Sequence, residues 1–204
     1  MQIHATAIVH PGAKLADDVV IGPFCVIGEH VSIGKGTRLL SHVTVDGWTD
    51  IGERNELHPF CSIGGPPQHL GYKGEPTRVA IGDDNIFREY VTVNRATMHG
   101  DAITSVGNKN FLMAYVHVAH DCRLGSHLIL ANAASLAGHI TIGDHAIIGE
   151  IKGRVTVLDK DGRPVPAATL AREDAARRKK VEDYARKQAV VAEQRKEKIG
   201  RAHV

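Results

Sequence analysis

Two short segments of this chain carry side chains that could perform acid–base chemistry. The first contains His117, His120 and Asp121, and the second contains Gly138 and His139. Gly138 follows His120 by 18 residues, and His139 follows Asp121 by the same number. A neutral histidine near a carboxylate suits general-base catalysis near neutral pH, and a glycine N–H suits stabilisation of an oxyanion. Together these groups predict acyl transfer to a hydroxyl or an amine.

Metal binding is the main chemical alternative to general-base catalysis. A zinc site of the γ-carbonic anhydrase type, shared across a trimer interface, needs two histidines separated by four residues and a third histidine further upstream. Here two residues separate His117 from His120, and neither position 81 nor position 84 is histidine. We therefore expect no metal site and no cofactor. Scattered corner histidines without a catalytic role remain open as a further alternative.

A six-residue repeat supplies the elements that must position these residues. Apolar residues, nearly all branched aliphatics, recur every six positions from residue 3 to residue 148, with two interruptions. Glycine often follows them, where we expect it to relieve backbone strain at a corner. Such a repeat predicts stacked short strands, and three of them close a coil of 18 residues. This coil places Gly138 over His120, and His139 over Asp121, about 5 Å apart.

The two interruptions of the repeat predict loops. Residues 64–80 carry three prolines and lack the aliphatic pattern, so we expect a loop that projects from the stack. The repeat also slips its phase between Asn94 and Ser105. Loops that leave a rigid scaffold are frequent places for binding residues.

The repeat ends at Gly149, which predicts a chain of two parts. Residues 1–149 hold more acidic than basic residues, whereas residues 150–204 are basic and show no repeat. Over 154–166 the sequence favours a short hairpin, and over 167–198 it lacks glycine and proline and favours a charged α-helix. Acidic residues interleave with the basic ones of this helix, so we expect a solvated face and no nucleic-acid site.

Several segments of the first part closely resemble the UDP-N-acetylglucosamine acyltransferase family. They read IGPFCVIG (21–28), SHVTVDGWTDIG (41–52), GEPTRVAIG (74–82), VHVAHDC (116–122), LANAASLAGH (130–139) and AIIG (146–149). The resemblance implies an all-β solenoid, a left-handed parallel β-helix. It also implies transfer of an (R)-3-hydroxyacyl group from acyl carrier protein to the 3-hydroxyl of UDP-N-acetylglucosamine, the first step of lipid A biosynthesis.

The resemblance also implies a role for each candidate residue. In the catalytic group, the general base would be His120, the carboxylate that orients or polarises the site would be Asp121, and the oxyanion-binding N–H would be that of Gly138. The substrate-binding residues would be His117, His139, Gln68 and His69. The family implies a homotrimer with active sites between subunits. Because no signal peptide and no long apolar segment is recognisable, we expect a cytoplasmic protein without a membrane span.

Differences from the family keep alternatives open. Residues 68–71 read Gln-His-Leu-Gly where the family usually has Gln-Asp-Leu-Lys, so the acceptor group is open between a 3-hydroxyl and a 3-amine. The family's further coils and C-terminal helical domain are not recognisable, and the final KIGRAHV reads like a translated sequencing adapter. We therefore expect a truncated copy with weak or no activity, and hypothesise that its tail is in part an assembly artefact. An inactive trimeric repeat protein and another acyltransferase of this fold are the alternatives.

Overall fold

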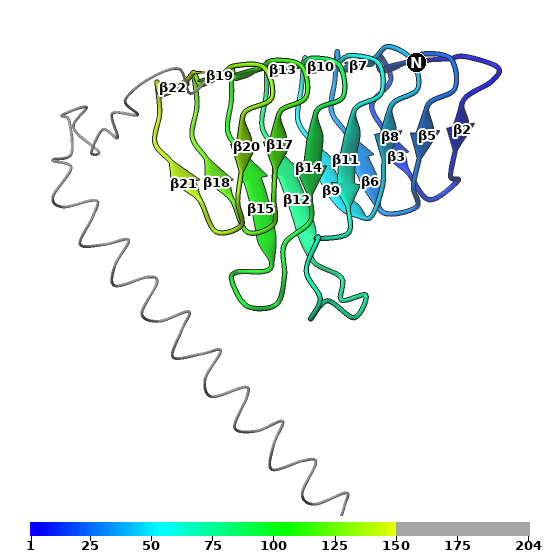
Figure 1. Cartoon of the computed structure of the whole chain (residues 1–204). Helices are drawn as coiled ribbons and strands as arrows, with labels where there is room; N and C mark the ends of the chain where they lie inside the picture. Colours follow the sequence, from blue (N-terminus) through cyan, green and yellow to red (C-terminus); the bar gives the residue numbers. More distant parts are fainter. Residues whose placement is uncertain (150–204) are drawn as a thin grey trace, which may run out of the picture. The chain divides into compact units, whose positions relative to one another are not determined.

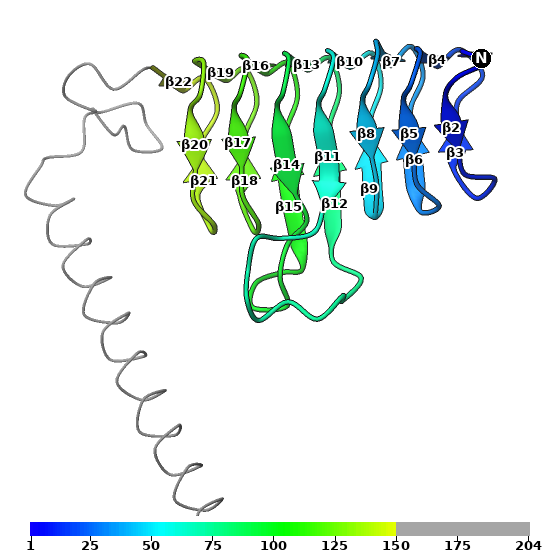
Figure 2. The same cartoon turned by 45° about the vertical axis from the view of Figure 1, so that its right-hand side comes forward.

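The computed structural model describes residues 1–149, which form a three-sided parallel β-helix (Figures 1 and 2). Each strand pairs in parallel with the strand three places further along the chain, so three sheets run the length of the stack. This topology confirms the predicted β solenoid. The predicted hairpin and helix of residues 150–204 lie outside the described residues. In the described part of the chain, no helix is long and apolar enough to cross a membrane.

Most strands contain only two residues, because a corner follows each of them. The first sheet consists of β1 (Gln2–Ile3), β4 (Val20–Ile21), β7 (Arg38–Leu39), β10 (Glu56–Leu57), β13 (Ile86–Phe87), β16 (Phe111–Leu112), β19 (Ile129–Leu130) and β22 (Ile147–Ile148). The second consists of β2 (Ile8–Val9), β5 (Val26–Ile27), β8 (Thr44–Val45), β11 (Ser62–Gly65), β14 (Thr92–Asn94), β17 (His117–Val118) and β20 (Ser135–Leu136). The third consists of β3 (Lys14–Leu15), β6 (Val31–Ile33), β9 (Trp48–Ile51), β12 (Arg78–Ile81), β15 (Ile103–Val106), β18 (Arg123–Leu124) and β21 (Thr141–Ile142).

The repeated aliphatic residues fill the interior of the stack. Ile21, Leu39 and Leu57 occupy paired positions in successive coils, 18 residues apart. Each of these side chains is at most 1% exposed. Burying such a side chain contributes about 1.5–3 kcal/mol relative to leaving it exposed. The six-residue repeat is therefore the pattern of the hydrophobic core.

Glycine has a different role at the corners from the one predicted. Of the described glycines that follow an aliphatic residue of the repeat, only Gly64 has a positive φ, of 80°. Most left-handed corner positions hold residues other than glycine, such as Phe24 (φ 58°) and Asp121 (φ 61°). Glycine is needed because the next coil approaches closely: a Cβ on Gly22 would lie 1.3 Å from the carbonyl oxygen of Leu40.

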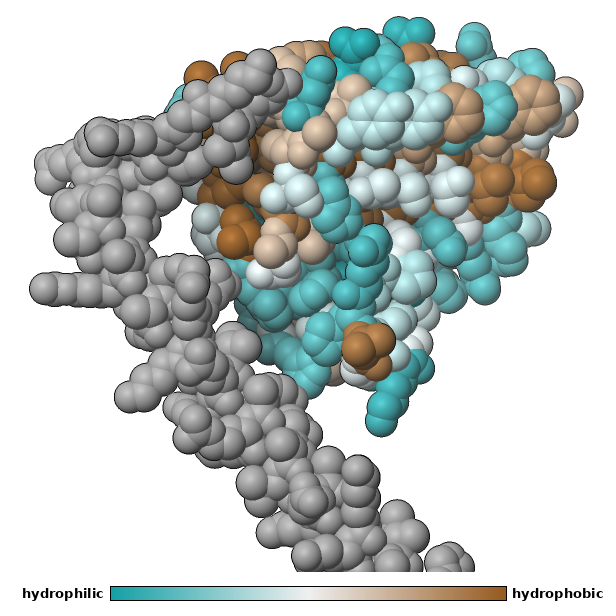
Figure 3. Space-filling view, in the orientation of Figure 1, coloured by the Kyte–Doolittle hydropathy of each residue, from teal (hydrophilic) through white to brown (hydrophobic). Residues whose placement is uncertain are grey.

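Two loops project side by side from one edge of the stack (Figures 1 and 2). The first joins β11 to β12 over residues 66–77, a shorter range than the predicted 64–80, because Arg78 and the residues after it pair with β9. The second joins β14 to β15 over residues 95–102, where the repeat slips its phase. The projecting part of the surface is mostly hydrophilic, with one hydrophobic patch near its tip (Figure 3).

Candidate active site

The stacking of two coils brings four predicted site residues together. His120 and Asp121 lie at the corner between β17 and β18, and Gly138 and His139 lie at the same corner of the next coil. A Cβ on Gly138 would lie 2.5 Å from Cε1 of His120, so the glycine backbone is in close contact with the imidazole. The N–H of His139 donates to the carbonyl oxygen of His120 at 3.0 Å. The 18-residue spacing therefore predicted this proximity correctly.

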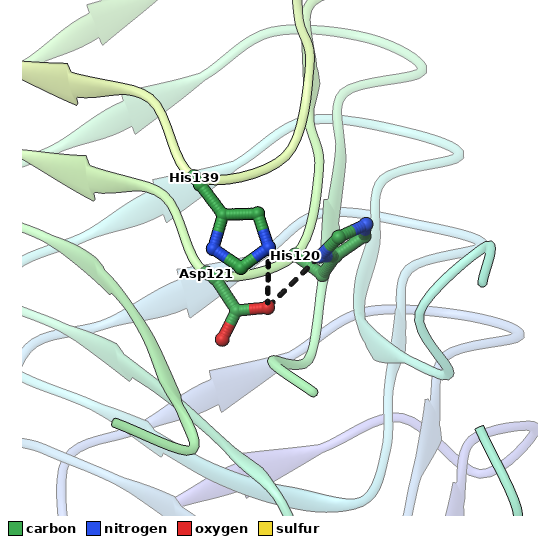
Figure 4. Close-up of side chains that lie close together, drawn as sticks. All are labelled: His120, Asp121 and His139. Carbon is green, nitrogen blue, oxygen red and sulfur yellow. Dashed lines mark hydrogen bonds and ion pairs between the residues drawn. The ribbon is translucent and has the colours of Figure 1, made fainter. Parts of the chain in front are cut away.

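Asp121 is the buried carboxylate to which both histidine side chains point (Figure 4). Its Oδ2 atom lies 2.9 Å from Nδ1 of His120 and 3.7 Å from Nε2 of His139. Thr97 of the second loop donates to the same oxygen through its N–H at 3.1 Å and its hydroxyl at 2.7 Å. Although it lies at a corner, Asp121 is only 7% exposed, because its side chain points toward the second loop and bonds to Thr97.

These contacts determine the charge of Asp121. Burial alone would raise the pKa of the carboxyl group, but the hydrogen bonds from His120 and Thr97 lower it by more. The pKa therefore lies below its ordinary value, and the carboxylate is ionised at neutral pH. A negative charge at this position favours the tautomer of His120 that carries its proton on Nδ1.

The second ring nitrogen of His120 is then free to accept a proton. With Nδ1 bonded to Asp121, the lone pair lies on Nε2. The position of a Cβ on Gly138 lies 2.8 Å from this Nε2, so the glycine backbone is beside the basic atom. The His120 side chain is 13% exposed, which leaves access from solvent. The arrangement can remove a proton from a bound hydroxyl or amine.

His117 lies next to this group on β17. Its Nδ1 is 2.7 Å from the hydroxyl oxygen of Thr92 on the preceding coil. Burial, and then the charge of His120, lower the pKa of His117 below its ordinary value. His117 is therefore a neutral imidazole at pH 7, suited to hydrogen bonding with a substrate and unsuited to ion pairing.

The first loop brings His69 to the site but leaves Gln68 apart from it. The ring centroid of His69 lies 5.4 Å from that of His120 and 5.5 Å from that of His99 on the second loop. Gln68 is exposed, and within residues 1–149 it makes no hydrogen bond to another predicted site residue. The structure thus places His69 beside the general-base candidate, and His99 on the other loop next to His69.

Three residues near the site were not predicted. Thr97 and His99 belong to the second loop, and the Thr104 hydroxyl on β15 accepts a hydrogen bond from the Asp121 N–H at 2.9 Å. The repeat gives no register for residues 95–102, so counting in sixes could not place them. A Thr-x-His sequence inside the interruption was the one available signal.

His120, Asp121 and His139 are also the described residues best placed to hold a metal ion. One potential ligand atom from each lies within 4.8 Å of the other two. The Oδ1 atom of Asp121 is buried and has no hydrogen-bond partner within residues 1–149. Two imidazoles and a carboxylate are ligands that zinc accepts. The expectation that the protein uses no metal stays a prediction.

Asp121 and His139 line an open pocket of about 200 Å³ beside the corner. A larger pocket of about 380 Å³ surrounds His30, Trp48 and Arg78 and contains none of the predicted catalytic residues. The smaller pocket adjoins the candidate site through Asp121 and His139, although His120 and Gly138 do not line it. We place the chemistry at His120, because there an imidazole, an ionised carboxylate and a close glycine backbone meet.

Comparison with curated proteins gives close relatives for about seven-tenths of the chain. An acyl-(acyl-carrier-protein)–UDP-N-acetylglucosamine O-acyltransferase of Thermodesulfovibrio yellowstonii is 54% identical over 145 residues, which are 71% of this chain and 56% of the relative. The enzyme of the same name from Syntrophobacter fumaroxidans is 52% identical over 138 residues, which are 68% of this chain and 54% of the relative. The chain therefore spans a little over half the length of the curated relatives it matches. No protein-family model matches it.

Solved structures agree with the sequence relatives. The crystal structure of a UDP-N-acetylglucosamine acyltransferase superposes with a TM-score of 0.72 at 50% identity. The match covers 73% of this chain and 57% of the chain in that structure. The structure of LpxA from Acinetobacter baumannii gives a TM-score of 0.71 at 50% identity. That match covers 72% of this chain and 57% of the LpxA chain. These likenesses confirm the resemblance stated from the sequence and support the predicted left-handed winding of the β-helix.

Proposed function

We infer that residues 1–149 belong to a UDP-N-acetylglucosamine acyltransferase, because relatives of that name match about seven-tenths of the chain at about half identity. We propose that the protein transfers an (R)-3-hydroxyacyl group from acyl carrier protein to the 3-hydroxyl of UDP-N-acetylglucosamine, in lipid A biosynthesis. The observation that carries the proposal is the contact between His120, the ionised Asp121 and the backbone of Gly138. These are the groups that acyl transfer requires.

The reaction would proceed by general-base catalysis. Nε2 of His120 removes the proton of the sugar hydroxyl while the oxygen attacks the thioester carbonyl carbon. The N–H of Gly138 stabilises the negative charge that develops on the carbonyl oxygen. The C–S bond then breaks, and the sulfur of the carrier leaves with the proton held by His120. Asp121 stabilises the imidazolium between the two proton transfers.

The other predicted residues would bind substrate around this centre. His139 and His117 lie on adjacent coils of the rigid stack, whereas His69 and Gln68 lie on the projecting loop. A rigid wall and a loop opposite it suit a sugar nucleotide that must enter and leave. His69 stands where the family usually has a carboxylate, so this loop is the place at which a hydroxyl and an amine acceptor would be distinguished.

We further propose that the protein is a cytoplasmic homotrimer that binds acyl carrier protein. A row of stacked rings along one edge of the prism supports self-association, because it leaves aromatic surface exposed. The row consists of Phe24, His42, Phe60, Tyr90 and Tyr115, with successive ring centroids 4.8–4.9 Å apart. Acyl carrier protein and sugar nucleotides are cytoplasmic reactants, which supports that location.

A direct assay tests the function. Purified protein is incubated with UDP-N-acetylglucosamine and radiolabelled 3-hydroxyacyl carrier protein, and acylated sugar is quantified. We expect His120→Ala to lower the rate by about 10²–10⁴-fold, the usual contribution of a general base. His127→Ala is the matched control, because His127 is an exposed corner histidine whose ring stacks only on His145 among the described rings.

Two outcomes distinguish the proposal from its alternatives. A folded, unmutated protein without any turnover favours the non-catalytic repeat protein. Turnover that is equal in His120→Ala and the unmutated protein would contradict the assigned general base. A parallel assay with the 3-amino analogue of the sugar nucleotide identifies the acceptor. If only the amino analogue is acylated, the acceptor is a 3-amine and not the proposed 3-hydroxyl.

A further inference from the structure

Arg95 is a buried arginine at the base of the two projecting loops. It follows β14 directly and is 7% exposed. Its Nη1 donates to the carbonyl oxygen of Gly64 at 2.9 Å, and its Nη2 donates to the hydroxyl of Tyr72 at 2.8 Å. Its backbone N–H donates to the carbonyl oxygen of Gly65 at 2.9 Å. A buried charge persists only where hydrogen bonds satisfy it, so the guanidinium depends on the end of β11 and on the Tyr72 hydroxyl of the first loop.

Two aromatic rings surround the same guanidinium. Its Cζ atom lies 5.5 Å from the centroid of the Trp48 ring on β9 and 5.9 Å from that of the Tyr72 ring on the loop. Both distances fall in the range of cation–π attraction. Gly47 leaves the space for this contact, because a Cβ there would lie 1.7 Å from Nη1 of Arg95. Arg95 therefore connects the loop to the coil stack through Tyr72 and Trp48.

We propose that Arg95 is a positioning residue that fastens the loop of residues 66–77 to the stack and so holds His69 beside His120. The N–H of Tyr72 donates to the carbonyl oxygen of His69 at 3.0 Å, so a fixed Tyr72 fixes the turn that carries His69. The ring of His69 then lies 5.4 Å from that of His120. The catalytic consequence of this arrangement rests on the proposed function, whereas the attachment itself does not.

The attachment of the loop depends strongly on the bonds that Arg95 makes, because several buried polar atoms at the base of the loop, one of Arg95 included, lack a partner. The buried atoms Thr77 Oγ1, Asn94 Oδ1 and Arg95 Nε have no hydrogen-bond partner within residues 1–149. Unpaired buried polar atoms destabilise the closed arrangement relative to one in which water reaches them. Loss of the guanidinium bond to Tyr72 and of the contact with its ring is therefore expected to release the loop while the hydrophobic core stays intact.

The chain carries its own probes of this attachment. Trp48 is the single tryptophan, and Lys73 is an exposed trypsin site within the loop. We expect Arg95→Met to shift the Trp48 emission and to accelerate cleavage after Lys73 by about tenfold or more, as the loss of hydrogen bonds to a charged group implies. Arg95→Lys keeps the charge without the fork of donors and should fall between.

The controls distinguish release of the loop from loss of the β-helix fold. Arg54→Met removes an exposed arginine that pairs with Asp84 and Glu53 on the stack, and should leave cleavage after Lys73 unchanged. Circular dichroism verifies that each variant keeps its β structure. An unchanged cleavage rate in folded Arg95→Met overturns the proposal. If that variant does not fold, Tyr72→Phe decides: it keeps Arg95 but removes the hydroxyl that accepts from it, which also donates to the carbonyl oxygen of Glu75. An unchanged rate there overturns the proposal equally.

The acyl-transfer assay then tests the consequence for the site. Because the loop holds substrate-binding residues and not the general base, we expect Arg95→Met to raise the KM for the sugar nucleotide more than it lowers kcat. A fall in kcat alone would contradict positioning of the loop. Absence of turnover in the unmutated protein would contradict the proposed function, while the cleavage experiment would still test the attachment.

Discussion

The imidazole of His120 is confined between a carboxylate and a glycine backbone, and this glycine has no room for a side chain. In Gly138→Ala the new methyl group would lie 2.5 Å from Cε1 of His120 and must displace the ring. Since a displacement of about 1 Å can cost about 10²-fold in rate, we expect a loss of that order in kcat/KM with little change in thermal stability. Gly143→Ala is the control, because a Cβ there meets nothing within 4 Å. Equal activity of the two variants would contradict the proposed geometry.

The lowered pKa of His117 makes the stability of the fold depend on pH. Burial, and then the charge of His120, favour the neutral imidazole in the folded state. Between this lowered pKa and about 6.5 the unfolded chain binds the proton more readily, so the free energy of unfolding decreases as the pH falls through that window. Urea unfolding at pH values from 7.5 to 5 measures the free energy of unfolding of the unmutated protein and of His117→Gln. We expect this free energy to fall less steeply with decreasing pH in His117→Gln. A His117 NMR titration midpoint at or above about 6.5 would contradict the prediction.

The 18-residue spacing predicted the site residues that lie on the coils, but it could not predict those that lie on the loops. Gly138 and His139 were placed correctly because a fixed period converts sequence separation into stacking. Thr97 and His99 come from an insertion with no period, so their contacts with Asp121 and His69 depend on three-dimensional folding of the loops. For the same reason, the burial of Asp121 could not be predicted from its corner position.

Among the structural elements, one corner of the stack contains a buried ladder of asparagines. The Oδ1 atom of Asn55 accepts from the N–H and the side-chain amide of Asn85, both at 2.9 Å. The Oδ1 atom of Asn85 accepts from the N–H of Asn110 at 2.9 Å, and its side-chain amide donates to the carbonyl oxygen of Gly107 at 2.9 Å. Each asparagine thus pairs backbone groups that the corners would leave unsatisfied.

Truncation of the middle asparagine should destabilise the stack strongly. Asn85→Ala leaves the Oδ1 of Asn55, the N–H of Asn110 and the carbonyl oxygen of Gly107 with fewer partners. At about 1–3 kcal/mol for each buried unsatisfied group, we expect a loss of at least about 2 kcal/mol in the free energy of unfolding. Asn108→Ala is the matched comparison, because Asn108 is exposed at a neighbouring corner, and should cost less than about 1 kcal/mol. Chemical denaturation of both variants provides the measurement.

The strands and coils could be predicted because the core repeats, whereas the corner chemistry could not. Residues such as Ile21 and Leu39 mark the period since each fills the same interior position. The asparagine ladder does not interrupt this period, so the period gave no sign of it. The role of glycine was predicted wrongly because the approach of Gly22 to the next coil is a contact between coils, which a single repeat does not show.

Across residues 1–149, a solenoid of this kind buries each coil only against its neighbours, so the contribution of a residue depends on its place in the stack. Ile3 and Ile27 occupy the same kind of interior position, but Ile3 lies in the first coil. Ile3 is 42% exposed, whereas Ile27, which has coils on both sides, is 1% exposed. Hydrophobic stabilisation should therefore be weaker in the first coil than in the coils that follow it.

The same substitution in these two coils tests this dependence. Ile27→Ala should cost about 2–5 kcal/mol in the free energy of unfolding, because it creates a cavity between two neighbours. Ile3→Ala should cost about 1 kcal/mol, since much of its side chain is in contact with water already. Urea denaturation measures both, and hydrogen exchange should show faster opening of β1 than of β5, because only the latter pairs on both sides. Equal losses in the two variants would contradict this dependence on the place of a residue in the stack.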